Sequence, residues 1–209
     1  MKKLFARRFL NFGLFLFAFL APAGVGAEEP LDTLRSTVEA AIDVVHDESF
    51  QELSLEDKYA EVREIMEDSY DLEIIVRRAM GRNWKKLRED QQAEVVELIK
   101  KMLVRTYLEN MEGEERPGIS YGDIVKISDK RVEVPATIKT KDQRYEVLYR
   151  FGRLKSGWAL YDIVAEDISI VSNYREQFND HFRNRDGAAL IKRLKQRIEE
   201  GDFNEELKL

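Results

Sequence analysis

Hydrophobic residues recur every three or four positions through the first half of the chain. Four stretches carry such a stripe and are predicted to be amphipathic helices: residues 31–45, 55–66, 71–81 and 89–111. Ser54, with Asp57 three residues later, has the pattern of a helix cap, and Asp71 can cap the third helix, which ends near Gly81. The apolar face of the fourth helix is wider than a single stripe, so we expect this helix to be buried on more than one side.

After residue 118 the hydrophobic period changes from three or four to two. Val132, Val134 and Ala136 alternate with polar residues, and Tyr145 and Val147 begin a second alternating run. Such alternation is typical of half-buried antiparallel strands. The simplest arrangement is a meander of four strands: Ile119–Ile127, Arg131–Lys141, Arg144–Leu154 and Trp158–Ala165.

Proline stands inside one of these predicted strands. Pro135 has no N–H to donate to a neighbouring strand, so we expect its strand to be an edge strand or to carry a bulge at this point. The helical period then returns over residues 172–182, and again from the expected cap Asp186 to Gly201. Helices, then strands, then helices predict an α+β domain, with helices packed over a small antiparallel sheet of about four strands.

The first 27 residues form a separate unit. Four basic residues precede the apolar run Phe9–Leu20, and small residues follow it up to Ala27. This pattern predicts a secretory signal peptide over residues 1–27 that is cleaved, leaving one domain over residues 28–209. The alternative is a membrane anchor, but a run of about a dozen apolar residues is short against the roughly 20 needed to span a bilayer. The chain has no cysteine, which excludes lipoprotein attachment.

The charge balance limits the possible partners. Removal of residues 1–27 leaves 30 basic and 40 acidic residues, a formal charge of −10. An acidic protein is a poor nonspecific ligand for nucleic acid, whose phosphates require Lys and Arg. The same charge opposes adhesion to an anionic bilayer, so we expect membrane contact to be transient or mediated by a partner.

Few residues are available for catalysis. The absence of cysteine excludes disulfides and a cysteine nucleophile, and the two histidines, His46 and His181, sit among charged neighbours and are expected at exposed positions. No nucleotide-binding, metalloprotease or serine-hydrolase motif is present. Acid–base chemistry by a strand carboxylate such as Glu133 or Asp162 stays open as an alternative, provided that the carboxylate faces a pocket.

Several spaced motifs run in order along the chain: Asp71, Met80-Gly81-Arg82-Asn83-Trp84, Gln91-Gln92, Thr106-Tyr107, Val147-Leu148-Tyr149, Gly157-Trp158-Ala159-Leu160-Tyr161-Asp162-Ile163 and Ile168-Ser169-Ile170-Val171-Ser172-Asn173-Tyr174-Arg175-Glu176-Gln177-Phe178. Together they resemble the MlaC family of periplasmic phospholipid-binding proteins, also called the toluene-tolerance family. The most specific part is a tryptophan four residues before an aspartate, followed by S-x-x-x-x-Y-R-x-Q-F.

The resemblance implies a fold and a function. The fold is α+β, similar to the NTF2-like and cystatin-like folds, and encloses an apolar cavity. The function is a periplasmic carrier, without catalysis or cofactor, that shuttles phospholipid between an outer-membrane lipoprotein complex and the substrate-binding ring of an inner-membrane ABC transporter, and so maintains outer-membrane lipid asymmetry. A shuttle of this kind is expected to be a monomer. A carrier of another apolar ligand, such as a hopanoid, is the third possibility beside the carrier and the pocket-carboxylate enzyme.

The cavity lining is predicted from strand alternation together with the fourth helix. The candidate lipid-binding residues are Met102, Tyr107, Val132, Val134, Ala136, Ile138, Tyr145, Val147, Tyr149, Phe151 and Leu160. The chain departs from the family pattern in two places. Val95, Val96 and Leu98 replace aromatic residues, which can change the cavity shape, and Asp167 replaces a glycine, which can re-aim the connection into the next helix.

Basic residues gather in one segment of this acidic chain. They are Arg77, Arg78, Arg82, Lys85, Lys86 and Arg88, here called the basic cluster. The cluster can meet a lipid phosphate near the cavity mouth or an acidic surface on a partner. Alternatively, it is a solvated helix end with cations near the negative end of the helix dipole.

Overall fold

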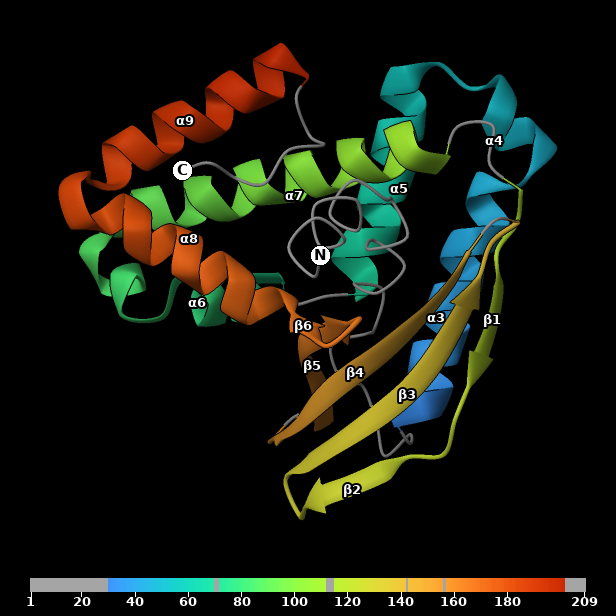
Figure 1. The fold of residues 1–209 in the computed structure, drawn as a ribbon. Helices are drawn as coiled ribbons and strands as arrows, with labels where there is room; N and C mark the ends of the chain where they lie inside the picture. The colour runs from blue at the N-terminus through green and yellow to red at the C-terminus, as the bar shows by residue number, and fades with distance from the viewer. Residues whose placement is uncertain (1–29, 70–71, 112–114, 142, 156, 202–209) are drawn as a thin grey trace.

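The computed structural model describes residues 30–69, 72–111, 115–141, 143–155 and 157–201 (Figure 1). The predicted signal peptide and the predicted cap Asp71 lie outside these residues. Within them, no helix is long and apolar enough to cross a membrane.

The four helices predicted before the sheet are present, with two short additions. The helices are α3 (Pro30–Val45), α4 (Glu48–Glu52), α5 (Leu55–Ser69), α6 (Leu72–Met80), the 3-10 helix η1 (Gly81–Lys86), α7 (Glu89–Met111), α8 (Ile170–Asn184) and α9 (Gly187–Glu200). Two predicted caps are confirmed by hydrogen bonds. The Asp57 N–H donates to Ser54 Oγ at 3.2 Å, and the Ala189 N–H donates to Asp186 Oδ1 at 2.9 Å.

The sheet is antiparallel and confirms the α+β class. Its strands are β1 (Gly118–Tyr121), β2 (Val125–Ser128), β3 (Arg131–Lys139), β4 (Arg144–Leu154), β5 (Gly157–Ala165) and β6 (Ile168–Ser169). They are ordered β1-β3-β4-β5-β6, and β2 also pairs with β3. The described residues therefore form six strands rather than about four. The first predicted strand is divided into β1 and β2, and β6 follows β5 after a tight turn.

Pro135 explains the division of that strand. It lies in β3, which is paired on both sides, so the expectation of an edge strand or of a bulge in its own strand is wrong. The Pro135 carbonyl accepts a hydrogen bond from the Gly122 N–H at 2.8 Å, and Gly122 lies in the gap between β1 and β2. The carbonyl and the nitrogen of one strand residue point to the same side. The missing proline N–H therefore faces the interruption in the neighbouring strand.

Two irregularities shape the last part of the sheet. The pairing of β4 with β5 shifts between Arg150 and Phe151, which leaves Tyr161 as an extra residue in β5. Glu166 and Asp167 then have φ values of +47° and +65° in the turn from β5 to β6. A glycine would adopt this backbone without strain, whereas Asp167 holds the left-handed conformation with a side chain in place.

The helices pack against one another and reach the sheet chiefly at β5. In Figure 1, α8 lies beside α6, α9 lies along α7, and α3 runs next to the β1 edge. The pair α6 and α8 is fastened by Arg175, whose Nη2 and Nε donate to the Arg78 carbonyl at 2.8 and 3.3 Å. Gly81 (φ +56°) lets the chain turn directly after α6, beside that arginine.

Candidate functional site

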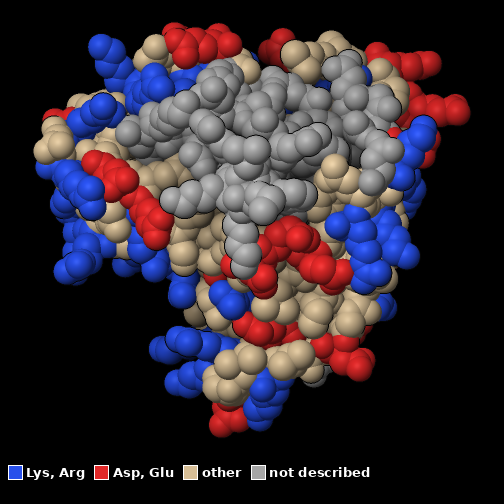
Figure 2. Space-filling model, in the orientation of Figure 1, with Lys and Arg blue, Asp and Glu red and all other residues tan. Residues whose placement is uncertain are grey.

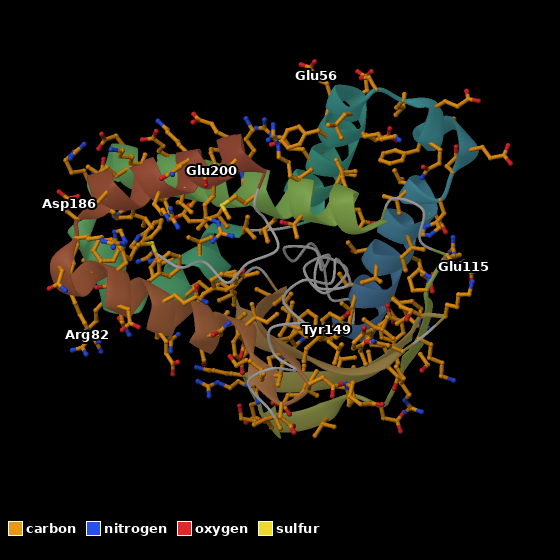
Figure 3. The ribbon with its side chains drawn as sticks, turned by 45° about the horizontal axis from the view of Figure 1, so that its top comes forward. Glu56, Arg82, Glu115, Tyr149, Asp186 and Glu200 are labelled. Carbon is orange, nitrogen blue, oxygen red and sulfur yellow. The ribbon has the colours of Figure 1, made fainter. Side chains whose placement is uncertain are left out.

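One face of the sheet, here called the inner face, is apolar and buried across three strands. The burial of β3 and β4 alternates strictly along each strand. The register pairs Val132 with Phe151, Val134 with Tyr149, Ala136 with Val147 and Ile138 with Tyr145, and Leu160 of β5 stands opposite Phe151. The nine strand residues predicted to line a cavity therefore share this one face. Tyr149 is labelled in Figure 3 on the side of β4 that is turned toward α7.

Two further residues of β5 belong to the inner face and were missed from the sequence. Ile163 is paired with Tyr149, and Ala165 is paired with Val147, and both are buried. Strict alternation from Leu160 would place Ile163 on the other face. The extra residue Tyr161 changes the phase, so that Leu160 and Ile163 both point inward.

The two predicted α7 residues are buried, and one of them holds helices together. Met102 is 9% exposed and Tyr107 is 1% exposed. The Tyr107 hydroxyl donates to the Ala41 carbonyl of α3 at 3.2 Å. Tyr107 therefore ties α7 to α3, in addition to any contact with a ligand.

Tyrosine hydroxyls of the sheet differ in whether they are satisfied. The Tyr145 hydroxyl donates to Gln143 Oε1. The Tyr149 and Tyr121 hydroxyls are buried and have no hydrogen-bond partner among the described residues. A buried hydroxyl without a partner costs about 1–3 kcal/mol. Burial raises the pKa of both hydroxyls, so each keeps its proton at physiological pH.

A similar unsatisfied group lies on α8. The side-chain amide of Gln177 has its nitrogen and its oxygen buried, and neither atom has a hydrogen-bond partner in the part of the chain that the structure describes. Gln177 belongs to the Y-R-x-Q-F motif, but its spacing gave no indication that the amide is unpaired. Tyr121 and Gln177 are the polar residues that inspection of the sequence did not single out for the site.

The opposite face of the sheet, here called the outer face, carries an ion-pair network. Arg150 donates from Nε to Glu133 at 2.9 Å and from Nη1 to Asp162 Oδ2 at 3.2 Å. Asp162 Oδ2 also accepts from the Ser169 hydroxyl at 2.8 Å, and its Oδ1 accepts from the N–H groups of Ile163 and Val171 at 2.9 and 3.2 Å. This buried carboxylate anchors the start of α8 to β5.

The network includes Glu133 and Asp162, the two carboxylates that the sequence suggested for acid–base catalysis. By register, Glu133 and Asp162 stand opposite Arg150, on the face away from the apolar side chains. Both are consumed in ion pairs and hydrogen bonds rather than facing the inner surface as isolated acids. Among the described residues, no group of three or more His, Asp or Glu side chains is arranged to hold a metal ion.

The expectation that both histidines are exposed is wrong. His181 is 1% exposed, and its Nε2 lies 3.0 Å from the Asp186 carbonyl oxygen. His46 is half-buried, with Nδ1 2.8 Å from the Ile42 carbonyl oxygen. Charged neighbours in the sequence misled the prediction because a helix places consecutive residues on different faces. Phe178 and Phe182 share the buried face of α8 with His181.

All six residues of the basic cluster are exposed, but they differ in whether they contact a neighbouring group. The Arg78 guanidinium lies 4.4 Å from the ring centre of Tyr161, Lys86 donates to the Phe182 carbonyl at 3.2 Å, and Arg88 pairs with Asp90. The other three residues pair with no carboxylate among the described residues: Arg77, Arg82 and Lys85. Lys and Arg gather on the left of the molecule in Figure 2, and Arg82 points outward in Figure 3.

A groove of about 390 Å³ lies between α7 and the segment formed by α6 and η1. It is lined by Leu72, Glu73, Trp84, Glu89, Gln92, Ala93, Val96, Glu97 and Lys100. Val96, one of the residues that departs from the family pattern, is here, whereas Val95 is fully buried. The Gln92 amide donates to the carbonyls of Trp84 and Leu87, so this motif residue closes η1 onto α7.

Comparison with known proteins identifies a matching family model and similar solved structures. The family model described as "MlaC protein" matches residues 35–196. A solved structure of a phospholipid-binding protein from Ralstonia solanacearum, determined in complex with a phospholipid, superposes with a TM-score of 0.65. The two sequences are 22% identical, and the match covers 79% of this chain and 96% of the other. No curated protein matches.

Proposed function

This chain belongs to the MlaC family, and from that premise we propose that it is a periplasmic carrier that binds phospholipid by its acyl chains. In this proposal the cleaved signal peptide delivers residues 28–209 to the periplasm. The carrier works as a monomer and performs no chemical step. It exchanges lipid with an outer-membrane lipoprotein complex and with the substrate-binding ring of an inner-membrane ABC transporter.

The observation that carries the proposal is the continuous apolar inner face of β3, β4 and β5. Exposing acyl chains to water costs about 0.8 kcal/mol per CH₂, so two long chains cost on the order of 20 kcal/mol. A carrier must offer a surface about as apolar as the bilayer interior, after which exchange is nearly neutral in free energy. Such exchange needs no nucleophile, metal or nucleotide, and any net direction must come from a partner.

The three residues of the basic cluster that pair with no carboxylate among the described residues form the proposed docking surface for these complexes. Arg77, Arg82 and Lys85 project from α6 and η1 of an otherwise acidic protein. Complementary charge accelerates encounter more than it strengthens the final complex. This use suits a carrier that must leave each partner after exchange.

The proposal is tested by native mass spectrometry of the protein recovered without detergent from the periplasm of bacteria that express the full chain. We expect a bound mass that denaturing extraction identifies as a diacyl phospholipid. A polycyclic lipid in its place would keep the carrier and change its cargo. A protein that is recovered empty and takes no lipid from vesicles would refute the carrier function.

A matched pair of variants tests which face binds the chains. Val147 and Leu148 are consecutive residues of β4, and their side chains point to the inner and outer face respectively. We expect Val147→Glu to abolish lipid loading because it places a carboxylate against the chains, and Leu148→Glu to retain it. Equal loading of the two folded variants would show that the inner face is not the binding surface.

A further inference from the structure

The two unsatisfied tyrosine hydroxyls stand on the inner face, on either side of β3. Tyr121 of β1 is paired with Ala136, and Tyr149 of β4 is paired with Val134. Ala136 and Val134 are two residues apart in one strand, so both tyrosines belong to the same face. Two strand spacings and an offset of two residues along the strands separate their backbones by roughly 12 Å. A charge on Tyr121 would further raise the pKa of Tyr149, as expected for neighbouring phenols.

The pair runs from the edge of the sheet to its interior. The Arg35 guanidinium of α3 lies 5.6 Å from the ring centre of Tyr121, which is half-buried. Tyr149 has no exposed surface and is surrounded on its strand by Val147 and Phe151. A ligand that lies along this line would meet one donor near the α3–β1 edge and the second donor deeper in the apolar surface.

These two donors require a partner with matching chemistry. Acyl chains have no hydrogen-bond acceptor, and a phosphate or headgroup is charged and favours water. The ester carbonyl oxygens of a glycerophospholipid are neutral acceptors at the junction between the two, and a diacyl lipid has two of them. Because burial raises the pKa of both phenols, both act as donors.

We propose that Tyr121 and Tyr149 donate hydrogen bonds to the ester carbonyl oxygens of a bound diacyl phospholipid. This inference rests on the proposed carrier function and extends it to the linkage chemistry of the cargo. The inner face selects lipids whose chains are joined by esters over otherwise identical lipids whose chains are joined by ethers. An ether-linked lipid lacks both carbonyl oxygens, and its ether oxygens are weaker acceptors, so it pairs less well with the two hydroxyls.

The test is a competition between two lipids that differ only in linkage. The protein, recovered from the periplasm and freed of lipid, is incubated with vesicles that contain equal amounts of diester and diether phosphatidylglycerol of the same chain length. Native mass spectrometry then gives the ratio of the two bound masses. This ratio does not depend on how much of a variant is folded, because only folded molecules bind lipid and both bound masses are measured on the same folded population.

Tyr149→Phe and Tyr121→Phe remove one hydroxyl each and keep the ring. We expect each to lower the diester-to-diether ratio about fivefold, the usual size of one neutral hydrogen bond, and the double variant to bring the ratio near 1. Tyr161→Phe, which removes a tyrosine hydroxyl from the outer face, is the control and should keep the wild-type ratio.

The outcomes separate this inference from the function on which it rests. A wild-type ratio near 1 with both lipids bound, or an equal fall in the Tyr161→Phe control, would overturn the role of the hydroxyls and leave the carrier intact. A wild-type protein that takes neither lipid would overturn the carrier function itself.

Discussion

Asp162 is expected to contribute more to stability than any other charged group of the sheet, because it satisfies four donors at once. Its Oδ1 accepts from the N–H groups of Ile163 and Val171, and its Oδ2 accepts from Ser169 and Arg150. Asp162→Ala leaves two backbone donors buried and unpaired, at about 1–3 kcal/mol each. Arg150 is partly exposed and still pairs with Glu133 in this variant, so the loss of its ion pair with Asp162 adds little to the cost. We expect the free energy of unfolding to fall by about 3–5 kcal/mol.

A graded series of variants tests this estimate. Asp162→Asn keeps an oxygen for the two N–H groups and loses the charged oxygen, so we expect an intermediate cost of about 1–2 kcal/mol. Glu133→Ala removes only the second partner of Arg150, at the edge of the network, and should cost less than about 1 kcal/mol. Urea denaturation measures all three, with the m-value as a check that the same two states are compared. An Asp162→Ala cost no larger than that of Glu133→Ala would refute the anchoring of α8 through this carboxylate.

Three further predictions concern backbone and surface positions. A Cβ at Gly187 would overlap Leu87 Cδ2 and lie 3.0 Å from Gln91 Oε1, so Gly187→Ala should lower stability by about 1–3 kcal/mol. Gly118→Ala is the control, because no atom lies within 4 Å of the new carbon, and it should lower stability far less. Thermal denaturation measures both variants. Asp167→Gly should raise stability by up to about 1 kcal/mol because it relieves a φ of +65°; an unchanged midpoint would show that the turn is unstrained. Charge reversal at Arg77 and Arg82 should slow lipid transfer to partner complexes several-fold at low salt. An equal effect of Lys192→Glu on α9, or unchanged transfer with normal loading, would mean that the basic cluster is only a solvated helix end.

The inner face could be predicted from the sequence because apolar and polar residues alternate along a half-buried strand, and the apolar residues mark its buried face. In β3 and β4, each predicted lining residue of one strand stands opposite a predicted lining residue of the other. The alternation no longer predicts which face a residue occupies beyond a bulge, because the extra residue shifts the pattern by one position. Tyr161 is such a residue in β5, and Ile163 was missed for that reason. The break between β1 and β2 was missed because it depends on Pro135, thirteen residues beyond Gly122 and on another strand.

The helix-cap hydrogen bonds could be predicted from local spacing, but the pairing of the buried tyrosine hydroxyls could not. Tyr145, Tyr149 and Tyr121 are indistinguishable in sequence, yet the hydroxyl of the first has a partner and the hydroxyls of the other two do not. Whether a hydroxyl is paired depends on which segment packs against it, and this information is absent from local spacing. The family motifs gave little help for the same reason. Asp162 and Arg175 carry much of the resemblance, and both fasten helices rather than line the inner face.

The two faces of the sheet divide stability from binding, and this division suits a protein that must stay folded both empty and loaded. The outer face and β5 hold the helices through Asp162 and Arg150, where no cargo is expected. The inner face of β3 and β4 offers apolar surface and two unsatisfied donors, which a well-packed core would not retain. Variants should therefore separate into two classes. Asp162→Ala should lower the unfolding free energy of the empty protein with little change in lipid preference, and Tyr149→Phe should change lipid preference while leaving the empty protein as stable or more stable. If both variants altered both properties together, the cargo would be part of the core, and exchange between partners would require partial unfolding.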